Sequence, residues 1–495
     1  MVNGNAAYVL DVNAQQNIEL VESPVKYCTV TLSDVLTRGK RLEASVFDVK
    51  AKHAHDMIAH GKYPAVSIGG KNGLIKDAYY PGRFKRIYCD SGSGEPFYLP
   101  SQMTDIYPKA DKNISSLTNC NINELKLKTK TLLLTRSGTI GTVSYVSKTI
   151  EGHVFSDDVI RVTFKNDVDL GYVYTYLKSK VGNIMLTTNG YGSVITHIEP
   201  EHLSTVPIPD APPLIKKRIN DLIVGSYELR DASNELIDKA NNLLIRELEL
   251  PPIEEFQRHA TYYQKNAPVN TFSVKLSNLD ERLEGSYHVP VVDAIVAHME
   301  KYAAEVTTVG DRRISKKIIL PGRFKRVYVE EGHGRVFIGG KQLYELDPTN
   351  KKYLSLVHHG DRISKQLELH EGMILITCSG TIGKVALVGK HWENWTANQH
   401  IIRVVPTSRD IAGYLSIFLA SEYGYPLITR YTYGAVVDEI NDTHVSKVPV
   451  PLLKDTNVQQ HINELALAAN EKRYEAYKME QQALRIMDRD VIFAK

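Results

Sequence analysis

Short apolar runs separated by turn-forming residues occupy two long stretches of the chain. Residues 131–135 and 373–377 are apolar and run into the turn sequence Ser-Gly-Thr-Ile-Gly, while residues 160–164 and 401–405 are rich in β-branched side chains. Runs of this length bounded by turn residues are typical of β-strands. A helix is expected after each group, over 171–180 and 411–423. The pattern therefore predicts two β-rich units, each with helical segments near its end.

A different pattern follows each unit, because an apolar residue then recurs at every seventh position. The first series is Ile215, Leu222, Leu229, Leu236, Leu243 and Leu250, with Ile219, Ser226, Ser233 and Ala240 as its companions. The second series is Val458, Leu465, Met479, Ile486 and Phe493, interrupted by Lys472, with Ile462, Ala469, Ala476 and Ala483 as its companions. Sustained heptads with polar flanks predict long helices that pair.

The small companion residues favour pairing of the two long helices with each other, because serine and alanine let helix axes approach closely. The alternative is that each helix lies only on its own domain, but a helix of about 38 residues is too long for one small domain to cover. We expect the pairing surface to consist of Ile215, Ile219, Leu222, Leu229, Leu236, Leu243, Ile462, Leu465, Ala469, Ala476, Met479, Ala483 and Ile486.

The chain also repeats itself at a nearly constant offset. Pro-Gly-Arg-Phe-Lys-Arg occurs at 81–86 and 321–326, Ser-Gly-Thr-Ile-Gly at 137–141 and 379–383, and Val-Pro-Ile/Val-Pro at 206–209 and 448–451. Tyrosine-glycine loops follow the same order at 191–195 and 433–437. The period is far longer than the ~20–50 residues of a solenoid, so it indicates two copies of one domain. We expect the proline-containing segment to close each copy, since proline ends regular structure.

These observations predict an α/β (α+β) fold with two duplicated β-rich domains, each followed by a long helix. The first domain is expected over 1–210, of which about the first 25 residues are read as an arm or tail. The first long helix and a proline-containing linker are expected over 211–268. The second domain is expected over 269–451 and the second long helix over 452–495. Two related domains at a fixed separation suit a protein that recognises two related things.

Composition narrows the setting of the protein. The four cysteines are scattered without a Cys-x-x-Cys pair, which fits a reducing cytoplasm. No apolar run approaches the ~18–20 residues of a membrane span, and no secretory signal is visible. The formal net charge is only +3, so binding of a polyanion would have to depend on local patches.

Such patches occur at matching places in the two copies. Residues 312–326 contain seven basic residues and no acid, and the first copy has both a matching segment and a further basic group near residue 130. This distribution is typical of contact with a phosphate backbone, although a solubilising surface loop is the alternative. The candidate DNA-binding residues are Arg83, Lys85, Arg86, Lys128, Lys130, Arg136, Arg312, Arg313, Lys316, Lys317, Arg323, Lys325 and Arg326.

Motifs for catalysis are not found. The sequence lacks a Gly-x-x-x-x-Gly-Lys-Ser/Thr phosphate loop, a His-Glu-x-x-His zinc helix and the Asn/Asp-Pro-Pro-Tyr/Phe segment of amino-methyltransferases. The histidines at 53, 55, 60, 358 and 359 could ligate a metal, but surface histidines are the better interpretation, and no metal site is predicted. The Ser-Gly-Thr-Ile-Gly motif is interpreted as a structural hairpin turn rather than a nucleophile, because the two copies share no histidine that could act as its base.

Taken together, the motifs resemble the specificity (S) subunit of type I restriction-modification systems. The resemblance rests on Gly94-Glu95-Pro96-Phe97-Tyr98 and its partner Gly334-Arg335-Val336-Phe337-Ile338, the repeated turns, the Val-Pro exits and the heptad helices, and it covers almost the whole chain. It implies two target-recognition domains and an antiparallel coiled coil. It also implies a DNA sequence-specificity subunit that reads a bipartite target in double-stranded DNA, one half-site per domain.

The resemblance further implies partners in a prokaryotic cytoplasm: methyltransferase subunits, two of them expected, and a restriction/translocase subunit. S-adenosylmethionine, ATP and Mg would then be bound by those partners, and this chain would be a non-catalytic subunit of a DNA adenine methyltransferase and ATP-dependent endonuclease. The chain is longer than many members of the family, which leaves open a related defence or modification system. A protein-interaction scaffold that binds no DNA is the other alternative. If the helices pair, their ~38 residues at ~1.5 Å per residue make a rod of about 57 Å. The two domains are then expected to sit at opposite ends of this rod, each facing its own half-site, about one to two helical turns apart.

Overall fold

The computed structural model describes residues 29–494 apart from 38–39, 41, 43, 91, 192–195 and 261–271, together with two short N-terminal strands, β1 (Tyr8–Val9) and β2 (Val21–Glu22). The tyrosine-glycine loop expected at 191–195 lies, apart from Tyr191, outside the described residues. Among the described residues, no helix is both long and apolar enough to cross a membrane.

Copy one is built from short strands and helices that lead into one long helix. Its elements are α1 (Leu32–Thr37), α2 (Val49–Ala59), β3 (Ala65–Ser67), β4 (Ile75–Tyr79), β5 (Tyr88–Cys89), β6 (Gly94–Tyr98), β7 (Lys112–Ser115), α3 (Ile122–Leu125), β8 (Leu132–Thr135), β9 (Val143–Tyr145), β10 (Val154–Phe155), β11 (Val159–Phe164), α4 (Asp167–Lys178), α5 (Lys180–Thr187), β12 (Pro207–Pro209) and α6 (Pro213–Glu247). The short helix α7 (Ile253–Ala260) follows α6.

Copy two repeats this order. Its elements are α8 (Pro290–Tyr302), β13 (Glu305–Thr308), β14 (Ser315–Ile319), β15 (Tyr328–Val329), β16 (Gly334–Ile338), β17 (Lys352–Ser355), α9 (Leu356–Arg362), β18 (Ile374–Thr377), β19 (Val385–Leu387), β20 (Thr396–Ala397), β21 (Ile401–Pro406), α10 (Arg409–Ala420), α11 (Gly424–Thr429), α12 (Asp442–Ser446), β22 (Pro449–Leu452) and α13 (Thr456–Ile486). A π-helical turn, η9 (Met487–Ile492), extends α13.

The sheets of the two copies have the same topology. One four-stranded sheet is ordered β4-β11-β8-β9 in copy one and β14-β21-β18-β19 in copy two. The other is ordered β10-β6-β7-β5 in copy one and β20-β16-β17-β15 in copy two, and its β10–β6 and β20–β16 pairs are parallel. The predicted fold class, a mixed α/β chain with β-rich sheets and long helices, is confirmed.

The Val-Pro segments differ from expectation. They do not end regular structure but are themselves strands, β12 and β22, which pair with β3 and β13 in two-stranded antiparallel sheets. Proline is compatible with such an edge position because its missing N–H need not contribute to the ladder. The expectation failed because the partner strand lies about 140 residues earlier in the chain, so no local pattern reveals it.

Each long helix packs on its own copy through a glycine. The Cβ that any other residue would place at Gly171 of α4 would lie 2.7 Å from the Cα of Asn220 on α6, and the Gly171 N–H donates to Asn220 Oδ1 at 3.0 Å. Copy two has the same arrangement, in which the Gly413 N–H donates to Asn463 Oδ1 at 2.8 Å. The same glycine-asparagine contact therefore fixes both long helices on their domains.

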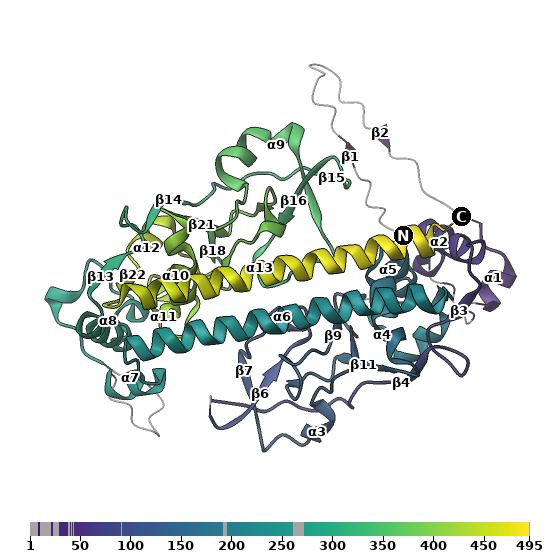
Figure 1. Cartoon of the computed structure of the whole chain (residues 1–495), viewed down its shortest axis with the longest axis horizontal. Helices are drawn as coiled ribbons and strands as arrows, with labels where there is room; N and C mark the ends of the chain where they lie inside the picture. Colours follow the sequence, from purple (N-terminus) through teal and green to yellow (C-terminus); the bar gives the residue numbers. More distant parts are fainter. Residues whose placement is uncertain are drawn as a thin grey trace.

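The long helices α6 and α13 lie side by side and run in opposite directions across the whole molecule (Figure 1). Their register is visible in hydrogen bonds, since Ser226 Oγ donates to the Ala476 carbonyl at 2.8 Å and Arg473 Nε donates to Ser233 Oγ at 3.2 Å. At ~1.5 Å per residue, the 35 residues of α6 span about 52 Å.

The small companion residues, rather than the large leucines, form the centre of the helix pair. Ile219, Ser226, Ser233 and Ala240 on α6, and Ile462, Ala469, Ala476 and Ala483 on α13, are all fully buried at 0% exposure. The larger residues of the predicted pairing surface flank them: Ile215, Leu222, Leu229, Leu236, Leu243, Leu465 and Met479 are half-buried, and Ile486 is buried.

Each long helix also reaches the core of the other copy. Ala483 and Ile486 of α13, with Met487, Val491 and Ile492 of η9, belong to the core of copy one. Ala240 and Leu244 of α6, with Leu248 and Leu250 just after it, belong to the core of copy two. The alternative that each helix lies only on its own domain does not describe this packing.

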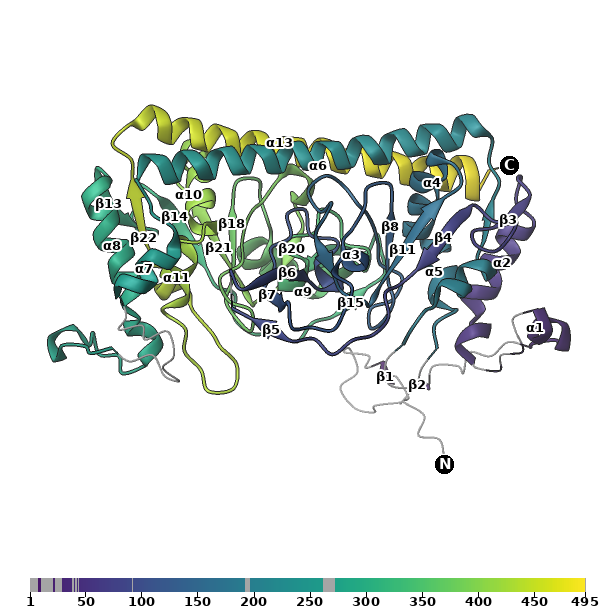
Figure 2. The same cartoon turned by 90° about the horizontal axis from the view of Figure 1, so that it is seen from below.

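The two copies also contact each other directly, in the central region that Figure 2 shows on one side of the helix pair. The Ile106 N–H donates to the Tyr344 carbonyl at 2.9 Å, and Asp105 and Glu345 form an isolated antiparallel bridge. Because the two residues are 240 positions apart, equivalent loops meet here. The expectation that the domains sit apart at opposite ends of the helices is therefore wrong for their central parts.

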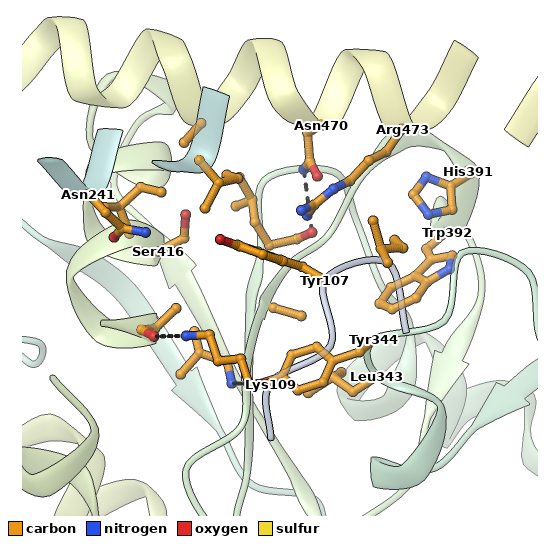
Figure 3. Close-up of a pocket in the computed structure, with 18 residues that line it drawn as sticks. Tyr107, Lys109, Asn241, Leu343, Tyr344, His391, Trp392, Ser416, Asn470 and Arg473 are labelled. Carbon is orange, nitrogen blue, oxygen red and sulfur yellow. Dashed lines mark hydrogen bonds between the residues drawn. The ribbon is translucent and has the colours of Figure 1, made fainter. Parts of the chain in front are cut away.

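A cavity of about 130 Å³ lies at this contact. Tyr107 and Lys109 of copy one enter it beside Trp392 and Ser416 of copy two, and Arg473 of α13 borders it from the helix side (Figure 3). Lys109 Nζ donates to the Ala420 carbonyl of copy two at 3.3 Å. The cavity is thus formed by both copies and both long helices.

A buried cluster of charged groups joins the same four parts. The Glu480 carboxylate on α13 is fully buried and accepts hydrogen bonds from Lys178 Nζ (2.6 Å), Tyr174 OH (2.5 Å) and Arg230 Nη2. Lys178 also donates to the Asp347 carbonyl of copy two at 3.1 Å. Burial raises the pKa of Glu480, but the positive charges of Lys178 and Arg230 outweigh it and lower that pKa to about 2.

Candidate nucleic-acid interface

A shallow hollow of about 470 Å³ on copy one contains part of the predicted basic set. It is lined by Arg83, Phe84, Arg86, Tyr88, Ser137, Asp157, Asp158 and His197. These residues come from four places: the segment that leads from β4 into the start of β5, the Ser-Gly-Thr-Ile-Gly turn, the loop before β11 and the loop after α5. The duplicated motifs that are far apart in the sequence thus meet at one surface.

The Ser-Gly-Thr-Ile-Gly motif is a hairpin turn between β8 and β9, as predicted. Gly138 and Gly141 have φ angles of 78° and 85°, a region that favours glycine. The Gly138 N–H donates to the Thr196 carbonyl at 3.1 Å, and Ser137 forms a bridge with His197. The turn therefore holds the loop after α5 in place, and its role here is structural.

Arg86 is fixed at the edge of the hollow by a carboxylate and a ring. Its Nη2 donates to Asp157 Oδ1 at 2.6 Å, and its guanidinium lies 5.4 Å from the centroid of Phe97. Burial lowers the pKa of Arg86, but Asp157 outweighs this effect and raises it. Asp157 is nearly buried at 6% side-chain exposure, whereas Asp158 beside it is 28% exposed, accepts a hydrogen bond from Arg136 Nη1 at 3.4 Å and lies 4.0 Å from Arg86 Nη2.

Copy two has the same frame with different side chains. Arg326 Nη2 donates to Gln399 Oε1 at 2.8 Å, where copy one has Asp157. The Gly380 N–H donates to the Asp438 carbonyl at 3.0 Å, and Ser379 bridges Glu439, where copy one has His197. The backbone hydrogen bonds match pair by pair, so the two surfaces share one framework.

One pair of residues that supports this framework was not singled out by sequence reasoning. Arg161 and Arg403 are buried in β11 and β21, and each guanidinium donates to four carbonyl groups. Four of these carbonyls belong to residues 155, 156, 397 and 398, next to Asp157 and Gln399. The sequence contained a sign of this pair, since both arginines occupy the same place in matched strands at the offset of 242.

The predicted basic residues fall into exposed and engaged groups. Exposed side chains belong to Arg83, Lys85, Lys128, Arg312, Lys316, Lys317, Arg323 and Lys325, of which Arg323 also pairs with Glu439 at 3.3 Å. Arg86 and Arg326 are half-buried and donate to Asp157 and Gln399. Lys130 pairs with Asp167 at 2.5 Å, and Arg313 pairs with Glu305 and Asp311. The extended segments 81–86 and 321–326 therefore contribute exposed cations in both copies.

Arg136 does not lie with the exposed group. Its side chain is 7% exposed, its Nη2 donates to Glu199 Oε1 at 2.6 Å, and its guanidinium lies 4.2 Å from the ring centroid of Tyr80. A guanidinium held in this way is not free to neutralise a phosphate. Copy two has Cys378 at the equivalent position, so the ion pair belongs to copy one alone.

The duplicated surface lies away from the helix pair. In Figure 2, α6 and α13 cover one side of the molecule, while β5, β15 and the yellow-green loop that follows α11 lie on the other. Residues 433–438 of that loop are exposed, and Tyr433 and Glu439 close it as a bridge. Within the part of the chain that the structure describes, no group of three or more His, Cys, Asp or Glu side chains could hold a metal ion.

Residues 330–465 match the family model of the type I restriction modification DNA specificity domain. The resemblance to type I specificity subunits is confirmed. No curated protein matches the chain.

Solved structures with overall similarity include the type I restriction-modification S subunit from M. genitalium, with 13% identity over 87% of this chain and 95% of that chain and a TM-score of 0.32. Another is a type I R-M system structure on complex assembly and conformational transition, with 13% identity, coverage of 87% and 99%, and a TM-score of 0.26. A third is the HsdS subunit from Thermoanaerobacter tengcongensis, with 12% identity, coverage of 85% and 98%, and a TM-score of 0.24. Scores of this size do not by themselves establish a shared fold.

Proposed function

We propose that this chain is the DNA sequence-specificity subunit of a type I restriction-modification complex. It reads a bipartite target in double-stranded DNA, one half-site per copy, and docks methyltransferase subunits. In this proposal residues 1–210 and 269–451 are the two target-recognition domains, and residues 211–268 and 452–495 contain the long spacer helices. The chain contributes recognition, while S-adenosylmethionine, ATP and Mg are bound by partner subunits.

The observation that carries the proposal is the duplicated surface, which is the hollow on copy one and the equivalent residues on copy two. Two surfaces with one framework, exposed arginine and lysine side chains and different polar linings lie on the side away from α6 and α13. Phosphate contacts position a protein on DNA without reading sequence, and polar side chains at base edges supply specificity. The two surfaces share their backbone hydrogen bonds and exposed basic residues but differ in the polar side chains between them. This is the arrangement expected of two related domains that each recognise a different DNA sequence.

The spacing between the half-sites follows from the helices and from the contact between the copies together. A deletion of residues 229–235, one heptad of α6, would also remove Arg230 and Asp231. Asp231 accepts hydrogen bonds from the Ser147 and Thr149 side chains of copy one, and Arg230 pairs with Glu480. The gap is therefore better tested by mapping the target than by shortening the helices.

The test is selection from a random duplex DNA pool by the full chain with its co-purified partners, followed by sequencing. We expect two short specified blocks of different sequence separated by a gap of fixed length. Binding to random DNA should also fall steeply with salt, on the order of 1,000-fold between about 50 and 200 mM if six or more phosphates are contacted. A single continuous block, or binding indifferent to salt, would favour a protein-interaction scaffold instead.

A further inference from the structure

Within the proposed function, on which this inference rests, three positions of the hollow differ between the copies while their surroundings do not. The constant positions are Arg83 and Arg323, Phe84 and Phe324, Arg86 and Arg326, Tyr88 and Tyr328, and Ser137 and Ser379. The variable positions are Asp157 and Gln399, Asp158 and His400, and His197 and Glu439. If the hollow were only a structural contact, the shared framework would not require its lining to change from two acids to an amide and an imidazole.

We propose that these three pairs are the base-reading residues, so that each copy's half-site is set by the side chains at 157, 158 and 197 or at 399, 400 and 439. The backbone that carries them is pinned in both copies. Arg161 in copy one and Arg403 in copy two bind the carbonyls beside Asp157 and Gln399. The Ser-Gly-Thr-Ile-Gly turn forms a bridge with His197 in copy one and with Glu439 in copy two. Rigid support of this kind lets a side chain discriminate bases.

The frame arginine couples to the first variable residue in both copies. Arg86 donates to Asp157 at 2.6 Å and Arg326 donates to Gln399 at 2.8 Å, so the same guanidinium orients either a carboxylate or an amide. An exchange of the two residues therefore keeps a hydrogen-bond acceptor in front of the arginine. The hollow can accordingly change its lining without losing its shape.

The second pair differs most in chemistry. Asp158 is 28% exposed, and its carboxylate oxygens, one of which accepts from Arg136 Nη1 at 3.4 Å, have lone pairs left that suit the exocyclic amino group of cytosine or adenine. At the same position His400 lies 3.0 Å from the Gln399 amide nitrogen, and burial together with Arg326 and Arg323 lowers its pKa. A neutral imidazole offers one donor and one acceptor. The two copies therefore present different hydrogen-bond patterns to a base edge.

The third pair completes the contrast at the loop after α5 or α11. Glu439 is 29% exposed and accepts from Arg323 Nη2 at 3.3 Å, whereas His197 is half-buried with its ring 5.9 Å from that of Tyr191. Arg323 is 82% exposed, so the pair with Glu439 is at the surface and can rearrange when a duplex arrives.

The test is a graft between the copies. The variant Asp157→Gln, Asp158→His, His197→Glu places the lining of copy two on copy one. The matched control is the reverse graft in copy two, Gln399→Asp, His400→Asp, Glu439→His. Each full-length variant, with its co-purified partners, selects from a random duplex pool, and its thermal unfolding is compared with wild type. We expect each graft to change one block only, a different block for each graft, and to leave the gap and the affinity for random DNA unchanged.

Two results would overturn the inference while leaving the proposed function intact. One is that both blocks stay as in wild type. The other is that a folded graft loses affinity for all DNA equally, which would make these residues phosphate contacts. If wild type itself selects no bipartite sequence, the proposed function fails instead. Should a graft unfold, the isosteric Asp158→Asn decides. We expect it to reduce preference at one base pair of one block on the order of 10- to 100-fold, and an unchanged preference would refute the assignment.

Discussion

Replacing Glu480 by glutamine tests whether the buried charges between the long helices hold the two copies in one cooperative unit. The substitution keeps the shape of the side chain but removes its charge, so Lys178 and Arg230 lose their shared counterion; Lys178 keeps Asp347 at 4.0 Å, whereas Arg230 is left without the carboxylate that pairs with it. Both cations have side chains that are 9% exposed, and water cannot compensate them. Removing one partner of a buried ion pair costs about 3–5 kcal/mol, because the remaining charge stays buried and unpaired.

The lowered pKa of Glu480 expresses the same interaction with Lys178 and Arg230. A value lowered from 4.5 to about 2 corresponds to about 3 kcal/mol of stability at neutral pH. Because the native pKa is depressed, this contribution is present above pH 4.5 and is lost as the pH falls through about 2. The variant should therefore lose stability at pH 7 but show a weaker decline than wild type between those values.

The assay is urea unfolding followed by two signals. The chain has only two tryptophans, Trp392 and Trp395, and both lie in copy two, so fluorescence reports that copy while far-UV circular dichroism reports both. If the charge cluster couples the copies, Glu480→Gln should lower both midpoints together. The matched control on the same helix is Glu471→Gln, which breaks a 3.2 Å pair of half-exposed groups and should cost less than about 1 kcal/mol.

Two outcomes would refute this reasoning. A loss in the Glu480 variant no larger than that of the Glu471 control would mean that the cluster does not stabilise the fold. A fluorescence midpoint that stays in place while circular dichroism shifts would mean that the copies unfold independently.

Three further predictions follow from single contacts. Asp105→Asn with Glu345→Gln should stabilise the chain at pH 8 but hardly at pH 4. Burial raises both carboxyl pKa values to about 7, so ionisation of the two groups weakens the native state only as the pH rises from about 4 to 7. Urea unfolding at both pH values measures the change in stability. Lys85→Glu and Lys325→Glu should each weaken binding to cognate and random DNA alike, measured by titration at fixed salt, whereas an effect on one sequence only would contradict a phosphate contact. Gly141→Ala should lower the free energy of unfolding by about 1–3 kcal/mol, because the φ of residue 141 is 85° and the added Cβ would lie 2.5 Å from a side chain of α5. Thermal unfolding measures the loss, and a variant that melts at the wild-type temperature would refute the predicted strain.

Much of the fold could be predicted from the sequence because its signals are local or repeated. The strands β8, β11, β18 and β21 lie within a residue or two of the apolar runs that predicted them. The turns at 137–141 and 379–383 could be interpreted because glycine at positive φ is a property of the turn itself. Repetition at a constant offset then showed that these local elements belong to two copies of one unit.

The candidate site was only partly predictable. Exposed cations such as Lys85 and Lys325 could be found as charge clusters. Arg136 looks the same in sequence, yet Glu199, 63 residues later, meets it in the fold and removes it from the exposed set. The charge of a side chain can be read from the sequence. Whether the side chain is free to bind a phosphate depends on neighbours that only the tertiary fold brings close.

The sequence by itself determined the duplication, the β-rich units and the presence of two long helices with small residues in register, because each depends on spacing along one segment. Only the tertiary structure decided which heptad series is fully buried, that the Val-Pro segments are strands, and that the copies meet at Asp105 and Glu345. It alone placed Glu480 beside Lys178 and Arg230. These features arise between residues far apart in the sequence, up to 302 positions for Lys178 and Glu480, and their energies come from burial and pairing that no local pattern records.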